Sequence, residues 1–298
     1  MKTVKENGQL AVVAKRQLAK LGTDQKNNIL AVCAKALRDN AEFIVGENAK
    51  DMENAKNNNM PQGLQDRLML NVERVNAMAE GLELIEKLPD PIGEVLDMRT
   101  LPNGLTVGQK RVPMGVIGII YEARPNVTSD AFGLCLKAGS AVILRGGSDA
   151  IHSNIATVSV FRKAIEDLGY NPDFVQLVED TTRASSTEMM TLNDYIDLLI
   201  PRGGKGLIQS VVKNATVPVI ETGVGNCHIY MDESGKIDDG VNIIVNAKAQ
   251  RVGVCNAAET LLVHKNIAKE YLPKAISALR EKGVEIRGDQ RVAEIVPD

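Results

Sequence analysis

The chain has 298 residues, of which 44% are hydrophobic and 24% charged, and its 35 basic residues nearly balance 38 acidic ones. This composition is typical of a globular protein and offers no basic patch or acidic tail, so nucleic acid and anionic membrane surfaces are poor partners. No apolar run reaches the roughly 18 residues of a transmembrane helix, and the first residues lack the apolar core of a secretory signal. The 4 cysteines are too sparse for a disulfide framework. We therefore expect a cytoplasmic protein of about two domains.

The first ninety residues have the spacing of helices. Apolar residues recur at three- or four-residue steps over 64–85, and two prolines end that predicted helix soon afterwards. An earlier helix begins near Asp24 and places Ile29, Cys33 and Leu37 on one face. Cys33 is therefore most simply a core residue.

The segment 94–112 has the pattern of a β-hairpin. Two runs of β-forming residues flank Pro102, Asn103 and Gly104, and Asn-Gly between such runs is a strong hairpin signal. The segment also separates the helical region from a different pattern. We therefore expect this hairpin to project from the body of the protein.

Short apolar runs then alternate with helix-like stretches. Val, Ile and Leu are continuous within these runs, which is typical of strands buried on both faces. Strands that alternate with helices form a parallel, doubly wound α/β sheet, and such sheets bind ligands at the carboxyl ends of their strands. The predicted strands are 115–122, 140–146, 174–180, 195–201 and 217–222. A helix, a turn, a strand, a second helix and a short strand are expected to follow Gly225.

Three glycine-rich polar turns follow predicted strands. Their backbone N–H groups could receive phosphate oxygens, and Arg145 could supply positive charge. The alternative is that the glycines only make tight turns, but three such turns at one edge of a sheet favour a binding cleft. Neither a G-x-G-x-x-G fingerprint nor a P-loop is present. The candidate cofactor-binding residues are Arg145, Gly146, Gly147, Ser148, Gly203, Gly204, Glu221 and Gly223.

Cys255 lies in a predicted tight turn, after Gly253 and before two alanines. Such a turn can expose a thiol whose thiolate attacks an acyl group while nearby N–H groups hold the oxyanion. On spacing alone, the pattern favours the alternative of a buried structural cysteine. Cys135 and Cys227 are predicted to lie in the core. The 3 histidines are scattered and no Cys/His spacing fits zinc, so we expect no metal.

Several segments resemble those of the gamma-glutamyl phosphate reductases, a family within the aldehyde dehydrogenase superfamily. They are YEARPNVTSD, LRGGSDA, IPRGGKGLI, VIETGVGNCH and AKAQRVGVCNAAETLLVH, and the similarity runs from the N-terminal helices to the last residue. It implies an aldehyde dehydrogenase-like α/β fold with a Rossmann-like parallel sheet. Residues 1–226 would form the cofactor-binding domain, with N-terminal helices 1–90, an oligomerisation hairpin 94–112 and the sheet 114–226. Residues 227–298 would form an incomplete catalytic domain.

The resemblance also implies a reaction. The family reduces L-glutamyl 5-phosphate with NADPH to L-glutamate 5-semialdehyde and phosphate, through a cysteine thioester, in proline biosynthesis. Cys255 takes the position of the superfamily's nucleophile, and Asn126 is the candidate for a second oxyanion donor. Arg124 is the alternative donor and a candidate contact for the substrate phosphate. Glu221 matches the superfamily's glutamate, which activates water in aldehyde oxidation, a step not needed here.

The cofactor assignment depends on the turn after the second strand of the sheet. Arg145 takes the place of a cofactor-binding lysine of the superfamily. Ser148 stands where relatives that prefer NAD often have an acid, which suits the 2′-phosphate of NADPH, although Asp149 adds a negative charge next to it. NADPH or NADP is therefore the expected cofactor.

The family's chains continue well beyond Asp298, so the resemblance identifies this chain as a fragment. A full-length protein is expected to be a homo-oligomer, with functional coupling to a glutamate 5-kinase. Two alternatives are an aldehyde-oxidising dehydrogenase on the same scaffold and a catalytically inactive nucleotide-binding fragment. The isolated chain is expected to retain nucleotide binding at best, to have negligible turnover and to aggregate through open strand edges.

Overall fold

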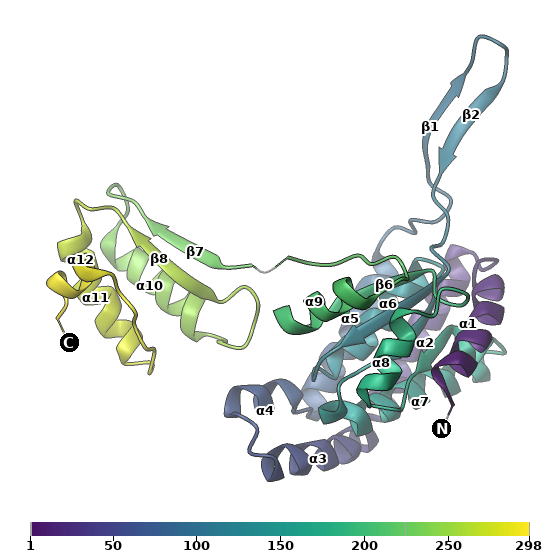
Figure 1. Cartoon of the computed structure of the whole chain (residues 1–298), viewed down its shortest axis with the longest axis horizontal. Helices are drawn as coiled ribbons and strands as arrows, with labels where there is room; N and C mark the ends of the chain where they lie inside the picture. The colour runs from purple at the N-terminus through teal and green to yellow at the C-terminus, as the bar shows by residue number, and fades with distance from the viewer. Residues whose placement is uncertain (1, 224, 298) are drawn as a thin grey trace. The chain divides into compact units, whose positions relative to one another are not determined.

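A computed structural model describes residues 2–223 and 225–297. The chain divides into two compact units, Met1–Thr222 and Gly223–Asp298 (Figure 1). The sequence analysis put the corresponding boundary four residues later, after 226. Each unit has its own hydrophobic core and is described by itself.

Unit 1 begins with the predicted helices. They are α1 (Val4–Leu18), α2 (Thr23–Asp39), α3 (Ala41–Asn57), α4 (Gln62–Leu68) and α5 (Val72–Lys87). The prediction of a single helix over 64–85 is wrong, because the chain is extended at Met69 and restarts as a helix after Asn71. The Asn71 side chain accepts the backbone N–H of Arg74 at 2.8 Å. Asparagine is a preferred N-cap, so it starts a new helix here.

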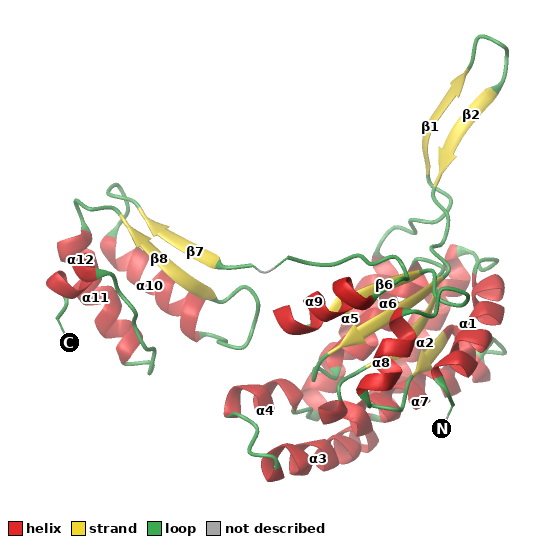
Figure 2. Cartoon of the chain, viewed as in Figure 1, coloured by secondary structure: helices red, strands yellow, loops and turns green. Residues whose placement is uncertain are grey.

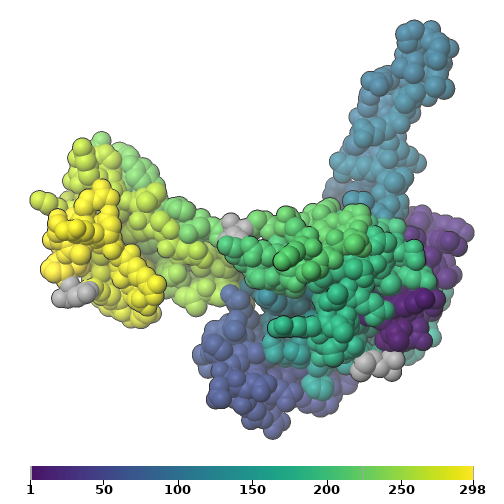
Figure 3. Space-filling model, in the orientation of Figure 1, coloured from purple at the N-terminus to yellow at the C-terminus, as the bar shows by residue number. Residues whose placement is uncertain are grey.

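The hairpin is present and exposed. β1 (Val95–Thr100) and β2 (Thr106–Lys110) pair antiparallel, and every residue of both strands is exposed. Gly104 has a φ of 87°, which glycine adopts readily, and Asn103 accepts the N–H of Leu105. Figure 3 shows the pair as an arm standing off the rest of unit 1. The expected hairpin is confirmed, and its role in oligomerisation stays a prediction.

A parallel sheet forms the centre of unit 1. Its strands lie in the order β5 (Val175–Leu177), β4 (Ala141–Arg145), β3 (Val116–Tyr121) and β6 (Leu198–Arg202). The strand predicted at 217–222 reduces to a single bridge between Val219 and Leu199. Pro218 lacks an N–H group, which shortens the ladder that this segment can form. The parallel α/β prediction is otherwise confirmed.

Helices cover both faces of this sheet (Figure 2). Alternate residues of β3 and β4 face α2, α5, α6 (Asn126–Lys137) and α7 (Ile151–Asp167). The residues between them face α1, α8 (Arg183–Met190) and α9 (Lys205–Asn214). All six residues of β3 are buried, so a continuous apolar run forms a strand covered on both sides.

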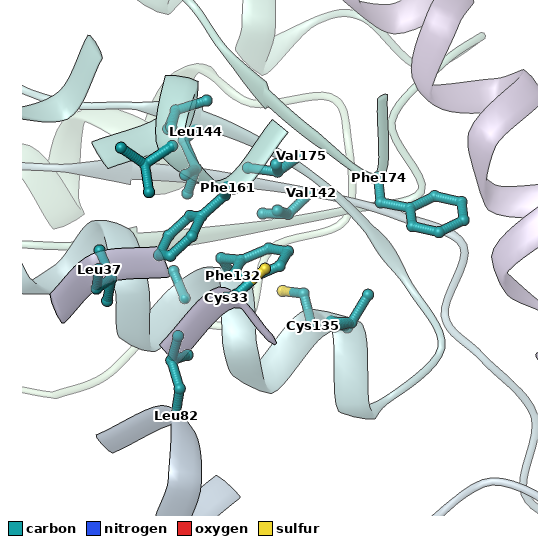
Figure 4. Close-up of a cluster of buried hydrophobic side chains, with 14 of the residues drawn as sticks. Cys33, Leu37, Leu82, Phe132, Cys135, Val142, Leu144, Phe161, Phe174 and Val175 are labelled. Atoms are coloured by element: carbon teal, nitrogen blue, oxygen red, sulfur yellow. The ribbon is translucent and has the colours of Figure 1, made fainter. Parts of the chain in front are cut away.

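The larger core contains two of the cysteines (Figure 4). Phe132 and Phe161 stack in its centre, with ring centroids 4.6 Å apart. Cys33 and Cys135 pack in the same cluster, as the sequence predicted. Burial raises the pKa of both thiols, to about 12 for Cys135. Neither forms a thiolate near neutral pH, so both are poor nucleophiles.

Unit 2 is a smaller α/β unit. β7 (Cys227–Met231) and β8 (Ala258–Val263) pair parallel and are joined by α10 (Ile237–Ala249). The helices α11 (Ala268–Arg280) and α12 (Gln290–Ile295) follow. The short strand expected after α11 does not form: the side chains of Val284 and Ile286 pack on the core of unit 2, but the segment joins no sheet. The prediction of a strand here is wrong, because the apolar side chains of this segment pack on the core without pairing its backbone with a strand.

The two sheets should differ in protection from hydrogen exchange. β3 and β4 each have strands on both sides, whereas β7 and β8 pair only with each other among the described strands. Two-stranded sheets are weakly stable alone, so amides of β3 and β4 should exchange at least about tenfold more slowly. Hydrogen exchange with mass spectrometry measures this directly. Equal protection of both sheets would contradict the expectation.

Candidate active site

The topology of the sheet predicts a ligand-binding crevice at the carboxyl ends of β3 and β6. The chain passes from β3 to β4 and β5 in one direction, and then returns to pair β6 with the other edge of β3. The helices that follow β3 and β6 cover opposite faces of the sheet, since α6 packs in one core cluster and α9 in the other. Their connections therefore diverge, which is the arrangement that binds ligands in open α/β sheets.

The turn that follows β3 lies against the turns that follow β4 and β6. A Cβ atom built on Gly147 would lie 3.5 Å from the backbone nitrogen of Ala123. One built on Gly203 would come within 2.7 Å of the Glu122 carboxyl carbon. Two of the three predicted glycine turns thus meet around the end of β3, and the Glu122 side chain packs directly against Gly203.

The start of α9 presents backbone N–H groups at this crevice. Gly204 is the N-cap, no side chain caps the helix, and its first turn contains no acidic residue. Lys205 is the first helical residue. The free N–H groups and the positive end of the helix dipole favour an anion here, although the Glu122 carboxylate lies near Gly204.

Arg145 brings positive charge to the same edge. It ends β4, and its Nη2 donates to the carbonyl oxygens of Thr181 at 2.6 Å and Thr182 at 2.9 Å. Its Nε is buried and has no acceptor among the described residues. Burial lowers the pKa of the guanidinium, and the Asp180 carboxylate partly offsets this. Arg145 therefore also holds the loop between β5 and α8.

Three other predicted site residues of unit 1 follow β3 or β4 within a few residues. Ser148 opens a 3₁₀ turn before α7 and is exposed together with Asp149. Asn126 is the first residue of α6 rather than part of the turn, and its amide donates to Asp130 at 3.2 Å. Burial raises the pKa of Asp130. Arg124 lies in the turn after β3, where its N–H donates to the carbonyl of Glu122.

Glu221 and Gly223 lie where the two units meet in the sequence. Glu221 is exposed and follows the bridge at Val219 by two residues. Gly223 is the first residue of unit 2 and is also exposed. The sequence grouped both with the cofactor-binding residues; Glu221 belongs to unit 1, as do the turns that follow β4 and β6, whereas Gly223 belongs to unit 2.

Cys255 lies in the turn between α10 and β8 of unit 2. Its side chain is exposed, unlike those of Cys33 and Cys135. The Cys227 thiol donates to the carbonyl oxygen of Cys255 at 3.4 Å, so the turn is tied to the first residue of β7. Cys227 is only partly buried, so the prediction of a core residue there is wrong. The structural alternative for Cys255, a buried thiol, is also excluded.

The aldehyde dehydrogenase family model matches residues 1–292. The chain belongs to this family. It is similar over 290 residues, with 55% identity, to gamma-glutamyl phosphate reductase of Lachnospira eligens, covering 97% of this chain and 70% of that protein. The Clostridium botulinum (strain Eklund 17B) protein of the same name is 56% identical over 298 residues, covering 100% of this chain and 72% of the relative.

A solved structure confirms the aldehyde dehydrogenase-like fold. The crystal structure of gamma-glutamyl phosphate reductase from Thermotoga maritima superposes with a TM-score of 0.89 at 45% identity, covering 100% of this chain and 72% of that chain. The chain is thus an oxidoreductase of the aldehyde dehydrogenase family that spans about 70% of the length of its relatives. This family implies a nicotinamide cofactor.

The described residues were also compared with what a metal site, a membrane-spanning helix or a second ligand groove would require. Within 2–223 and 225–297, no group of three or more His, Cys, Asp or Glu side chains could hold a metal ion. No helix of the described residues is long and apolar enough to cross a membrane. An apolar groove of about 780 Å³ runs along β8, α11 and α12, but none of the candidate residues lines it.

Glu122 was not among the predicted site residues. It is the first residue after β3, in the same turn as Arg124. Its contact with Gly203 is visible only once β3 and β6 are known to be neighbours. β3 begins 82 residues before β6, and nothing in the sequence indicates that two strands so far apart pair.

Proposed function

We propose that this chain reduces L-glutamyl 5-phosphate with NADPH to L-glutamate 5-semialdehyde and phosphate, in proline biosynthesis. The observation that carries the proposal is 55–56% identity, over 97–100% of the chain, to proteins named gamma-glutamyl phosphate reductase. That identity over nearly the whole chain supports a common activity with these proteins.

The carboxyl edge of the sheet in unit 1 fits a phosphate-bearing cofactor. The start of α9, just after Gly203, offers N–H groups without a side-chain cap. The buried Nε of Arg145 has no acceptor among the described residues. These groups would hold the phosphates of NADPH, and a reduced nicotinamide bound there supplies a hydride. The 2′-phosphate is assigned to Arg145 and Ser148.

Cys255 is the proposed nucleophile. Its thiolate attacks the acyl carbon of the substrate, the bond between that carbon and the phosphate oxygen breaks, and inorganic phosphate leaves. The product is a thioester on Cys255, and addition of a hydride followed by loss of the thiolate yields the aldehyde. Asn126 or Arg124 is assigned to the developing oxyanion, and Arg124 also to the substrate phosphate.

A kinase that phosphorylates the side-chain carboxylate of glutamate must supply this substrate. Acyl phosphates react readily with water, which favours functional coupling to a glutamate 5-kinase. The exposed strands β1 and β2 are assigned to a homo-oligomer, because their open edges suit pairing with another copy. The reaction belongs to the cytoplasm, where NADPH and this substrate are produced.

The reaction is tested by supplying L-glutamyl 5-phosphate in situ from a glutamate 5-kinase. The chain is assayed alone and as a hybrid completed with the part of the Thermotoga maritima protein that it does not span. We expect the hybrid to oxidise one NADPH for each semialdehyde formed. Reduction of NADP with release of glutamate from the semialdehyde would indicate the aldehyde-oxidising alternative. No turnover by a folded hybrid would contradict the proposal.

A further inference from the structure

A chain of buried polar groups lies under the turn that follows β4. The Tyr121 hydroxyl lies 2.7 Å from the Thr128 hydroxyl, which donates to Asn154 Oδ1 at 2.8 Å. A threonine hydroxyl has one proton to donate, so Tyr121 donates to Thr128 and the chain runs in one direction. All three side chains are buried, and they come from the end of β3, the first turn of α6 and the first turn of α7.

The amide nitrogen of Asn154 ends this chain and lies against Gly146. Asn154 Nδ2 is buried and has no acceptor among the described residues. A Cβ atom on Gly146 would overlap that nitrogen and would lie 3.2 Å from Cζ of Tyr121. Asn154 and Tyr121 therefore occupy the space that any larger residue at 146 would need.

The first turn of α7 is also held from its other side. The Asp51 carboxylate of α3 accepts the N–H groups of His152 at 3.1 Å and Ser153 at 2.8 Å, and the Ser153 hydroxyl at 2.6 Å. Asn48 donates to that hydroxyl at 3.0 Å. Asn154 is therefore fixed by its own helix as well as by Thr128.

We infer that Asn154 is a positioning residue: through Thr128 and Tyr121 it sets the shape of the turn at Gly146, between Arg145 and Gly147. The inference rests on the proposed function in one respect, that this turn binds the nucleotide. Asn154 itself is fully buried, so we assign it no direct contact with the nucleotide. It acts on binding through the backbone, because a displaced Gly146 also displaces the residues on either side.

The test uses NADPH titration of the whole chain and hydrogen exchange of 146–150. Thr128→Val removes the hydroxyl that links Tyr121 to Asn154 while keeping the side-chain shape, and Thr128→Ser keeps the hydroxyl. We expect Thr128→Val and Asn154→Ala to weaken NADPH binding by about tenfold and to speed exchange of the turn, as loss of a buried polar link does. Thr128→Ser should stay near the parent.

Thr157→Val is the matched control. Thr157 is buried in α7, the helix that also contains Asn154, and its hydroxyl has no partner among the described residues. Its replacement should leave both NADPH affinity and exchange of the turn unchanged, even if it changes the melting temperature. Equal losses in Thr157→Val and Thr128→Val would mean a general packing effect and would overturn the inference.

A double-mutant cycle shows whether Gly146→Ala and Asn154→Ala act on NADPH binding through the same contact or independently. Gly146→Ala alone should weaken NADPH binding, because the new Cβ displaces Asn154. In Gly146→Ala/Asn154→Ala that obstacle is gone, so the double variant should bind no worse than Asn154→Ala. A loss of NADPH affinity in the double variant equal to the product of the two single losses would contradict the inference. If the parent chain binds no NADPH, the proposed function fails, and exchange of the turn alone still decides whether Asn154 positions it.

Discussion

Replacing Cys255 with serine should lower NADPH-dependent reduction by the completed hybrid at least about 1,000-fold, because a nucleophile is lost and no second group replaces it. Binding of NADPH should stay within about twofold of the parent, since Cys255 belongs to unit 2 and the turns that follow β4 and β6 to unit 1. Steady-state rates and a nucleotide titration on the same preparation measure both effects.

The matched control is Cys227→Ser. Cys227 also belongs to unit 2 and contacts the turn through the carbonyl of Cys255, yet it is assigned no chemical step. This variant should keep most of the activity. A loss as large as that of Cys255→Ser would mean that the shape of the turn, and not the thiol of Cys255, is what the reaction needs.

Alkylation gives a second measure of the same assignment in the chain as it stands. Iodoacetamide should modify Cys255 before Cys33 and Cys135, because burial raises the pKa of those two thiols and only thiolates react. Peptide mapping after brief treatment shows the order. Even labelling of the four cysteines would count against Cys255 as the reactive group.

Replacing Arg145 with alanine should narrow the preference for NADPH over NADH by one to two orders of magnitude. A charge-assisted contact with the 2′-phosphate is worth about 1.5–3 kcal/mol, and NADH lacks that phosphate. Dissociation constants for both nucleotides, measured on parent and variant, give the ratio. Equal affinity of the parent for NADPH and NADH would refute this role of the turn.

Arg145→Lys distinguishes the two tasks of this residue. Lysine keeps the charge but cannot reproduce the fork that donates to Thr181 and Thr182. If Arg145 acts through charge, the lysine variant should retain a preference for NADPH. If it acts only by holding the loop, both substitutions should weaken NADPH and NADH binding equally.

The sheet, and the glycine turns at the carboxyl ends of its strands, could be predicted because their pattern is local. The residues of β3 form an unbroken apolar run, and glycines follow β4 and β6 directly. The same rule failed at Val217–Ile220, where a proline limits pairing to one bridge. It failed again at 64–85, because apolar spacing continues across the break that Asn71 caps.

The contacts around the candidate site depend on which residues the fold brings together, and the sequence pattern does not indicate them. The Asn154 side chain occupies the space that a Cβ atom at Gly146 would need, but nothing in the spacing of the two residues indicates this contact. Glu122 meets Gly203 only because β6 returns to the free edge of β3. Cys255 could be judged buried or exposed from its sequence alone, and the structure decides for exposure.

The most direct test of a cysteine-dependent acyl phosphate reductase is to trap the acyl enzyme. The completed hybrid is mixed with L-glutamyl 5-phosphate without NADPH, quenched in acid and mapped by mass spectrometry. We predict a glutamyl adduct on Cys255 that is absent from Cys255→Ser and disappears when NADPH is added, with formation of the semialdehyde. An unmodified Cys255 in an enzyme that nevertheless reduces the substrate would contradict the proposed mechanism.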